Sequence, residues 1–419
     1  MQIFIYKFMN NFVVENKKVL LLGVGGISMN QLAQAYLKLG YEVFGYDAHK
    51  SAVTDKLKSI GVKIAHKFIN HFLDVDFCVA TGAIKNDNPY VIELKKLKIP
   101  IIDRSVALGK LLTNFKCVIA VAGTHGKSTT SALIYEILKS AGKKVSCHIG
   151  AEVGSPRFEL GDDYIVVEAC EYNKSFLNIY PDVAVVTNVE PEHLDCYTNF
   201  KNLQNAFSTF LKRAKKRFVF DEQSTNFLKK YKNINFITKK SHKSALKGEY
   251  NQKNISIAEY VCLNLGINQN VINAVVANFS GLPRRYECIG QYGKTKVYID
   301  YAHHPTEVKS FVSAFNEEYK NSLVIFQPHT YSRTKMFFEE FVELLSSQKN
   351  ICVFKEYPAR ENKTAGVDAK TLFEAVKCKN KNCKYLSSVQ PLKKLALNYD
   401  AIAFVGAGDI EKFAKQFVR

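Results

Sequence analysis

The sequence predicts an α/β protein in which helices cover mainly parallel sheets, arranged as three domains. Two stretches, at residues 19–39 and 117–138, have the pattern of an apolar strand, a glycine-rich turn and an amphipathic helix. After residue 297 several apolar runs each end in a polar loop, and we expect a further, Rossmann-like α/β domain there. A chain of 419 residues is long enough for several cores, and we expect domains at residues 1–112, 113–281 and 282–419.

The first strand, at residues 19–22, enters a turn containing Gly23, Gly25 and Gly26. A helix extends from there to residue 39, and a second strand at 41–47 ends at an acidic residue. This β-α-β order is typical of dinucleotide-binding folds, so we expect a Rossmann-like amino-terminal domain. Because Ser28 replaces the third glycine of the fingerprint, the turn predicts an anionic ligand at the helix start but not NAD in particular.

Another strand, at residues 76–80, ends at Thr81, Gly82 and Ala83. Loops at the carboxyl ends of parallel strands are where open α/β sheets bind ligands. A short strand and turn over 97–104 and a helix over 106–112 then lead into the central domain.

The central domain is predicted to be a P-loop ATPase-like parallel sheet built around one turn. A strand at 117–121 precedes this turn and a helix at 131–138 follows it. The residues of the turn are Gly123, Thr124, His125, Gly126, Lys127, Ser128 and Thr129. Lys127 is placed to reach the β- and γ-phosphates of a nucleotide, and the Ser128 hydroxyl to ligate Mg²⁺. Val121 stands where the general pattern has a glycine, but packing alone rarely explains a Gly-Lys-Ser turn.

Acidic residues follow two later strands of the same predicted sheet. The strand at 164–167 delivers Glu168, and the strand at 183–186 leads to Glu192 and His193. A triphosphate needs a divalent cation, and carboxylate and imidazole ligands could hold one here. Taken singly, Glu168 fits a surface carboxylate and His193 a helix-start or core histidine equally well.

A helix is predicted over residues 255–265, preceded by Asn251 and Asn254, which either cap it or contact a base. The chain carries a net charge of +19, but its lysines are scattered and form no nucleic-acid motif, so we expect no nucleic-acid partner.

The ten cysteines stand mostly singly in apolar runs, which favours a reducing compartment, and Cys378 and Cys383 lack further zinc ligands nearby. No run approaches the about 20 apolar residues of a membrane span, so no membrane insertion is expected. The opening residues do not resemble a signal peptide, and translation starts at either Met1 or Met9.

Taken together, the motifs resemble the ATP-dependent amide ligases that build the peptidoglycan stem peptide, most of all those that add L-alanine. Seven separated motifs follow the family's order: residues 123–129, 168–172, 187–195, 281–287, 300–307, 326–333 and 406–410. The amino-terminal turn at 23–29 also matches, so the resemblance extends from about residue 18 to the carboxyl end.

The resemblance implies a cytoplasmic ligase, monomeric or homodimeric, that uses ATP and Mg²⁺ to join UDP-N-acetylmuramate to L-alanine through an acyl phosphate. ATP would be bound by Gly123, Thr124, His125, Gly126, Lys127, Ser128, Thr129, Asn251, Arg285 and Asp300. The metal ligands would be Ser128, Glu168 and His193. The UDP end would contact Gly23, Gly25, Gly26, Ile27, Thr81, Gly82 and Ala83, while His303, His304, His329 and Arg333 would lie near the amino acid. The catalytic residues would be Lys127, His193, His329 and Arg333.

The chain departs from the family's usual residues at Glu192, Tyr250 and Thr330, where Asp, His and Arg respectively are common. Two other functions remain open at this point. A sibling ligase that joins a recycled tripeptide to the same nucleotide sugar would share the catalytic centre. An NAD(P)-dependent oxidoreductase would use the amino-terminal turn but would leave the Gly-Lys-Ser turn unexplained.

Overall fold

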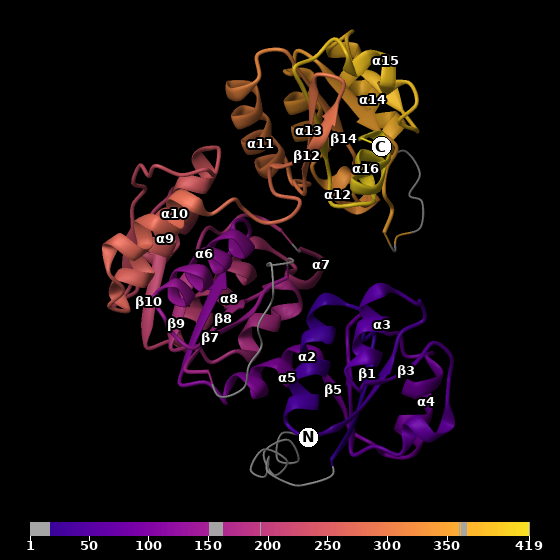
Figure 1. Ribbon diagram of the computed structural model, residues 1–419, viewed down its shortest axis with the longest axis vertical. Helices are drawn as coiled ribbons and strands as arrows, with labels where there is room; N and C mark the ends of the chain where they lie inside the picture. The colour runs from indigo at the N-terminus through magenta and orange to yellow at the C-terminus, as the bar shows by residue number, and fades with distance from the viewer. Residues whose placement is uncertain (1–16, 151–161, 193, 360, 362–366, 419) are drawn as a thin grey trace. The chain divides into compact units, whose positions relative to one another are not determined.

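The computed structural model describes residues 17–150, 162–192, 194–359, 361 and 367–418. Its strands form three sheets, one of five strands and two of six, with helices packed around each (Figure 1). The chain divides into two compact units, of which the first holds two sheets and the second holds the third. The predicted fold of three α/β domains is confirmed, whereas their exact boundaries stay a prediction.

The amino-terminal sheet is entirely parallel and has the strand order β3-β2-β1-β4-β5. Its strands are β1 (Lys18–Leu22), β2 (Glu42–Tyr46), β3 (Lys63–Ala65), β4 (Phe77–Ala80) and β5 (Ile101–Asp103). Its helical segments are α2 (Ile27–Lys38), α3 (Ala52–Ser59), η1 (Asn70–Leu73), α4 (Pro89–Lys96) and α5 (Arg104–Leu112). Both faces of β1 are buried, since Val19 and Leu21 pack in one cluster and Leu20 and Leu22 in another. This burial on both sides is why the strand is a continuous apolar run.

The central sheet is also parallel, with the order β11-β10-β9-β6-β8-β7. Its strands are β6 (Cys117–Ala122), β7 (Val145–His148), β8 (Tyr164–Glu168), β9 (Val183–Val186), β10 (Lys216–Phe220) and β11 (Asn235–Ile237). Its helical segments are α6 (Lys127–Ser140), η2 (Tyr172–Asn178), α7 (Leu194–Tyr197), α8 (Phe200–Lys212), η3 (Gln223–Leu228), α9 (Glu249–Asn264) and α10 (Gln269–Asn278). The predicted phosphate turn therefore follows the carboxyl end of a strand with neighbours on both sides.

The first two sheets share one hydrophobic cluster, which explains why two domains form one compact unit. At this junction Gly109 of α5 faces η2, and a Cβ at Gly109 would lie 2.0 Å from the Asn178 carbonyl oxygen. Only glycine permits so close an approach. Asn178 Nδ2 also donates to the Ser105 hydroxyl (2.8 Å).

Helix α9 begins earlier than the sequence predicts. It starts at Glu249, so Asn251 and Asn254 lie inside the helix and the prediction that one of them caps a helix starting at residue 255 is wrong. Asn251 Nδ2 donates instead to the carbonyl of Lys247, just before the helix (2.8 Å), and Asn254 Nδ2 donates to Asn251 Oδ1 within it (3.2 Å). Both asparagines can be buried because these bonds engage their amides.

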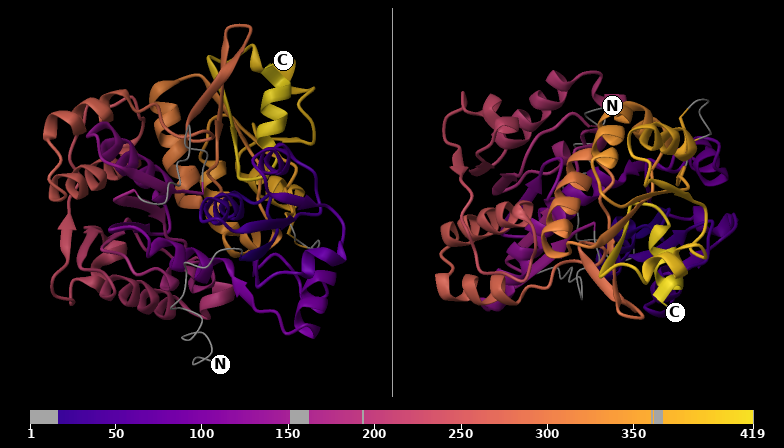
Figure 2. Two further views of the ribbon diagram at one scale, coloured as in Figure 1. Left: turned by 60° about the horizontal axis from the view of Figure 1, so that its bottom comes forward. Right: turned by 90° about the horizontal axis from the view of Figure 1, so that it is seen from above.

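The carboxyl-terminal sheet has the order β12-β13-β17-β14-β15-β16 and is parallel except for the antiparallel edge strand β12. Its strands are β12 (Glu287–Tyr292), β13 (Thr295–Asp300), β14 (Ser322–Phe326), β15 (Ile351–Phe354), β16 (Lys384–Leu386) and β17 (Ala401–Val405). Its helices are α11 (Pro305–Glu318), α12 (Tyr331–Met336), α13 (Phe338–Ser346), α14 (Ala369–Lys379), α15 (Leu392–Ala396) and α16 (Ile410–Val418). Apolar side chains cover both faces of the sheet. Helix α16, near the carboxyl terminus, packs against β12, β13 and β17 (Figure 2).

Among the described residues, no helix combines the length and apolar character needed to cross a membrane.

Candidate functional site

The phosphate-loop candidate connects the carboxyl end of β6 to the first turn of α6. Gly123 has a φ of +142°, and a Cβ at this residue would lie 1.9 Å from Thr187 Oγ1, so the loop can approach the end of β9 only with glycine here. The His125 N–H donates to Asn188 Oδ1 (2.8 Å), and the Thr187 hydroxyl donates to the His125 carbonyl (2.6 Å). Hydrogen bonds from the neighbouring strand end therefore fix the backbone of the turn.

Lys127, the first residue of α6, points back into this loop. Its Nζ donates to the carbonyls of Gly123 (2.5 Å) and Thr124 (3.0 Å) and lies 3.2 Å from Glu171 Oε1. Burial by itself lowers the pKa of Lys127, but Glu171 and other acidic neighbours outweigh it and raise the pKa above its ordinary value. The loop thus holds a fixed positive charge beside the N–H groups that start α6, an arrangement that binds polyphosphates.

Ser128 and Glu168 supply a pair of oxygen ligands next to the loop. The Ser128 hydroxyl donates to Glu168 Oε2 (2.9 Å), which also accepts the Gly150 N–H (2.9 Å). Mg²⁺ prefers hard oxygen ligands and shares them with substrate phosphates, so these residues fit that ion. The third predicted ligand, His193, lies outside the described residues, and Glu192 before it is buried.

The sequence prediction omits two residues that hold the loop, Glu171 and Asn188. The Glu171 side chain is only 2% exposed where it pairs with Lys127. Both residues lie in loops within three residues of the carboxyl ends of β8 and β9, and that position is the signal by which they could have been found.

An exposed turn after Glu171 is also missing from the prediction. Asn173 and Lys174 adopt left-handed backbone conformations, with φ of 52° and 57°. Consecutive non-glycine residues in this region carry strain, which concentrates at ligand sites. A Cβ at Gly82 would lie 3.9 Å from Asn173 Nδ2, so the strained turn borders a loop predicted to bind substrate.

The two loops predicted to hold the UDP end lie together in the structure. A Cβ at Gly23 would lie 3.3 Å from Thr81 Cγ2, which brings the glycine turn next to the loop after β4. Thr81 closes that second loop, because its Oγ1 accepts the Ala83 N–H (3.1 Å) and its carbonyl accepts the Ile84 N–H (3.0 Å). The turn and the loop after β4 thus form one continuous edge.

Asp47, the acidic residue after β2, is engaged with the backbone. Its Oδ2 accepts the Gly25 N–H (2.9 Å) and its Oδ1 accepts the His49 N–H (3.1 Å). Gly26 is the N-cap of α2 without a side-chain bond, and Ile27 at the first position is half exposed. Since the first turn of α2 contains no acidic residue, the positive end of its dipole is not balanced from within the helix.

In the second compact unit, the predicted adenosine-side residues Asn251, Arg285 and Asp300 surround Tyr250. Tyr250 interacts with all three, and burial raises its pKa. Asp300 is buried and accepts two backbone N–H groups at 2.7 Å each. Burial raises the pKa of Asp300 to about 6 against the opposing effect of the Arg285 charge.

Three of the residues predicted to bind the amino acid form a cluster beyond the carboxyl ends of β13 and β14. Arg333 Nη1 bonds His329 Nδ1 (3.0 Å), and the rings of His303 and His329 lie 5.8 Å apart. Burial, with the nearby His303 and Arg333, lowers the pKa of His329 to about 4, so its imidazole is neutral at pH 7. The His304 side chain caps α11 and packs edge-on against Phe337 with ring centroids 4.5 Å apart, so its place near the amino acid stays a prediction.

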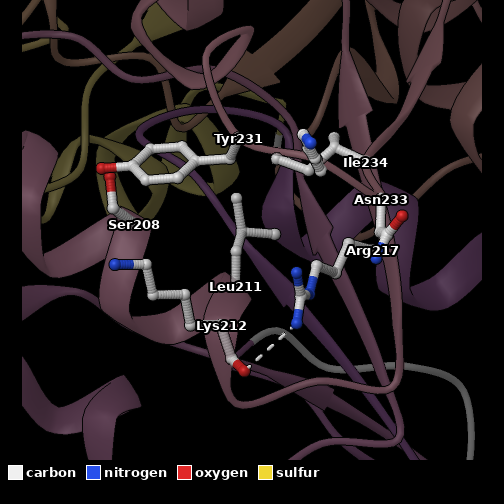
Figure 3. A pocket seen from close by; sticks show the side chains of 8 residues that line it. Ser208, Leu211, Lys212, Arg217, Tyr231, Asn233 and Ile234 are labelled. Carbon is white, nitrogen blue, oxygen red and sulfur yellow. Dashed lines mark hydrogen bonds between the residues drawn. The ribbon is translucent and has the colours of Figure 1, made fainter.

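One pocket of the central domain, of about 260 Å³, is drawn in Figure 3. Its lining includes Lys212, Arg217 and Tyr231, but Arg217 donates to the Ala214 and Lys212 carbonyls at the end of α8. The Lys212 amine lies 5.1 Å from the centroid of the Tyr231 ring. The pocket lies at the amino ends of β10 and β11, at the opposite edge of the parallel sheet from the phosphate loop, so it is not part of that site.

Three family models match consecutive parts of the chain. Residues 18–116 match the Mur ligase family, catalytic domain. Residues 121–277 match the Mur ligase middle domain, and residues 284–409 match the Mur ligase, glutamate ligase domain.

Curated relatives are similar over nearly the whole chain. A protein of Caldicellulosiruptor saccharolyticus named UDP-N-acetylmuramate–L-alanine ligase is 34% identical over 441 residues, which cover 94% of this chain and 97% of the relative. A protein of the same name from Aquifex aeolicus is 35% identical over 450 residues, covering 96% and 97%.

Solved structures agree on the fold. The UDP-N-acetylmuramate-alanine ligase of Thermotoga maritima has a TM-score of 0.80 at 23% identity, covering 96% of this chain and 98% of that one. A murein peptide ligase of Psychrobacter arcticus has a TM-score of 0.67 at 20% identity, with the same two coverages.

Proposed function

The chain belongs to the Mur ligase family, and from that premise we propose that it uses ATP to join L-alanine to UDP-N-acetylmuramate. It is an ATP-dependent ligase that forms an amide bond in peptidoglycan synthesis. The observation that carries this proposal is the phosphate loop, in which Lys127 is held by Glu171 beside the Ser128–Glu168 oxygen pair.

The chemistry follows from the poor reactivity of a carboxylate toward amines. A muramoyl carboxylate oxygen attacks the γ-phosphorus of ATP, the bond to the bridging oxygen breaks, and ADP leaves. The alanine nitrogen then attacks the acyl carbon and loses a proton, while the carbon–oxygen bond breaks and inorganic phosphate leaves. Lys127 and the loop N–H groups stabilise the charge on the transferring phosphoryl group. Mg²⁺, held by Ser128, Glu168 and the predicted ligand His193, would neutralise phosphate charge.

We assign the remaining predicted residues by their surroundings. The edge formed by the glycine turn and Thr81 takes the UDP end of the sugar nucleotide. The residues around Tyr250, namely Asn251, Arg285 and Asp300, bind adenosine and phosphate. The cluster of His303, His329 and Arg333 binds alanine, because a guanidinium pairs well with a carboxylate. His304 belongs here through the family resemblance alone.

The same proposal includes a cytoplasmic location and a monomeric or homodimeric state. The cytoplasmic location is supported by the cysteines, since none in the described residues forms a disulfide.

Two alternatives are less well supported. A ligase for a recycled tripeptide would share the phosphate loop, but the curated relatives at 34% and 35% identity carry the name of the alanine ligase. An NAD(P)-dependent oxidoreductase would leave the phosphate loop without a role, and Asp47, its expected ribose ligand, bonds the loop backbone instead.

A coupled assay of phosphate release tests the proposal. Phosphate should appear only when ATP, UDP-N-acetylmuramate and L-alanine are all present, and should fall when Mg²⁺ is chelated. Competition with the tripeptide, glycine and serine in the same reaction measures the choice of amino acid. ATP hydrolysis that ignored the sugar nucleotide, or a clear preference for the tripeptide, would contradict it.

A further inference from the structure

Three polar side chains from distant parts of the sequence meet at the start of α2. Ser28 is the second residue of α2, Arg104 is the first residue of α5, and His148 is the last residue of β7 in the central sheet. Arg104 Nη1 lies 3.0 Å from Ser28 Oγ, and Ser28 Oγ lies 2.9 Å from His148 Nε2. The chain of contacts therefore joins the central domain to the turn that we assign to the UDP end.

The direction of each hydrogen bond follows from which atoms carry protons. A guanidinium can only donate, so the Ser28 oxygen accepts from Arg104. The hydroxyl proton of Ser28 remains available for His148, and we assign the tautomer in which Nε2 accepts this proton and Nδ1 carries the ring proton. Burial and the Arg104 charge lower the pKa of His148 to about 3, which keeps the imidazole neutral and able to accept.

Arg104 lies where its charge would attract an anion. The guanidinium contacts the first turn of α2, a helix of 12 residues whose first turn contains no acidic side chain. A cation at the positive end of a helix dipole is repelled. The adjacent Asp103 carboxylate is engaged in capping α5 through the Ser105 N–H (2.8 Å). A diphosphate would be attracted to both the helix start and the guanidinium.

Resting on the proposed function, we propose that His148 is a positioning residue for the diphosphate of the UDP-sugar. By accepting the Ser28 proton, it directs the Ser28 lone pairs to Arg104 and holds the guanidinium beside the glycine turn. His148 itself does not contact the substrate in this role. Because it lies on the central sheet, it also ties the UDP-binding turn to the domain that binds ATP.

The test compares UDP binding by titration calorimetry in four variants: His148→Leu, Ser28→Ala, their double mutant and His148→Gln. His148→Leu removes the acceptor, and we expect UDP and UDP-N-acetylmuramate to bind roughly 10-fold more weakly. The Michaelis constant for ATP should change by less than about twofold, because the phosphate loop keeps its own contacts. The double mutant should bind UDP no more weakly than the single mutant with the lower affinity, since both substitutions act through the same series of hydrogen bonds.

His148→Gln is the rescue variant, because its amide oxygen reaches about the position of Nε2 and can accept the same proton. It should restore UDP binding to within about threefold of the wild type. The matched control is Gln31→Met, since Gln31 Nε2 joins α2 to the Ile149 carbonyl (3.4 Å) across the same junction without touching Ser28. UDP binding should be unaffected in this control.

Three results would overturn the role of His148. They are unchanged UDP binding in His148→Leu, an equal loss in Gln31→Met, and additive losses in the double mutant. Calorimetry needs no turnover, so these results can be read separately from the ligase reaction. A wild-type protein that bound UDP but released no phosphate would contradict the proposed reaction alone, and one that bound no UDP would overturn both.

Discussion

The two glycine turns of the first compact unit have the same local architecture but different sources of positive charge. Each follows a buried parallel strand and starts a helix without an acidic residue in its first turn. In the phosphate loop the cation is Lys127, the residue directly after the turn. In the amino-terminal turn the cation is Arg104, 76 residues from the serine that it contacts. A turn whose cation lies within the motif can be recognised from sequence. A turn whose cation is distant in sequence, and is brought close only by folding, cannot.

The carboxylates near the two turns differ in the same way. Glu171 and Glu168 bond the side chains of Lys127 and Ser128, the two groups predicted to meet phosphate and metal. Asp47 instead accepts the backbone N–H of Gly25. The acidic residues beside the phosphate loop therefore contact the side chains that we assign to the reaction, whereas Asp47 contacts the backbone of the turn that we assign to UDP. Mutations in the two turns should accordingly affect different kinetic constants.

The largest expected effect is that of Lys127→Ala. It removes the fixed charge at the transferring phosphoryl group, so phosphate release should fall on the order of 10²-fold or more. UDP-sugar binding should stay near normal, because that ligand is assigned to the other turn. Steady-state kinetics and calorimetry measure the two quantities. The control is Lys139→Ala, which removes a lysine of the same helix that is 57% exposed and pairs with Glu136. Wild-type turnover in Lys127→Ala would rule out this loop as the phosphate site.

Arg104→Gln should have a smaller and different effect. We expect the Michaelis constant for the UDP-sugar to rise roughly 10-fold, because one charge-assisted contact to phosphate is lost, with turnover changed by less than about threefold. Lys110→Gln, on the same helix, is the control and should leave this constant unchanged. If Arg104→Gln lowered turnover as strongly as Lys127→Ala, the distinction between a binding turn and a reacting turn would be wrong.

The contrast between the two turns also shows which parts of the structure can be predicted from the sequence. Strands β1, β6, β8 and β9 and both glycine turns are predicted because each is encoded by residues close together in the chain. The start of α9 is missed, because asparagine is common at helix caps and Asn251 and Asn254 are therefore placed before the helix, whereas the boundary lies at Gly248.

The partners of the site residues are harder to predict than the residues themselves. Ser28, Arg104 and His148 come from three separate elements, and only the packing of two sheets on one hydrophobic cluster brings them together. Glu171 is part of a recognisable motif, yet its pairing with Lys127 depends on the adjacent positions of β6 and β8. No local pattern encodes contacts of this kind.

The smallest expected effect is on the pH dependence of folding stability, to which His148 and Lys127 should contribute differently. The pKa of His148 is lowered from 6.5 to about 3, so the unfolded chain binds a proton there that the folded protein excludes. Stability is therefore lost as pH falls below about 6.5, and this one group should contribute a loss on the order of 1 kcal/mol between pH 7.5 and 6.0. The pKa of Lys127 is raised above 10.5, so its contribution is constant over this range and would be lost only at much higher pH.

The measurement is urea unfolding of the wild type, His148→Leu and Lys127→Ala at both pH values. Other groups also titrate here, since burial lowers the pKa of His329 to about 4 and raises that of Asp300 to about 6, with opposite effects on stability as the pH falls. Their contributions cancel when the pH-dependent difference is compared between variants. His148→Leu should lose less stability than the wild type on acidification. Lys127→Ala should not show this pattern for the same reason, because it leaves the Glu171 carboxylate buried without its cation, and proton uptake there adds stability as the pH falls. Equal losses in the wild type and His148→Leu would mean that His148 is not held neutral by its burial, and the assignment of the hydrogen bonds among His148, Ser28 and Arg104 would fail.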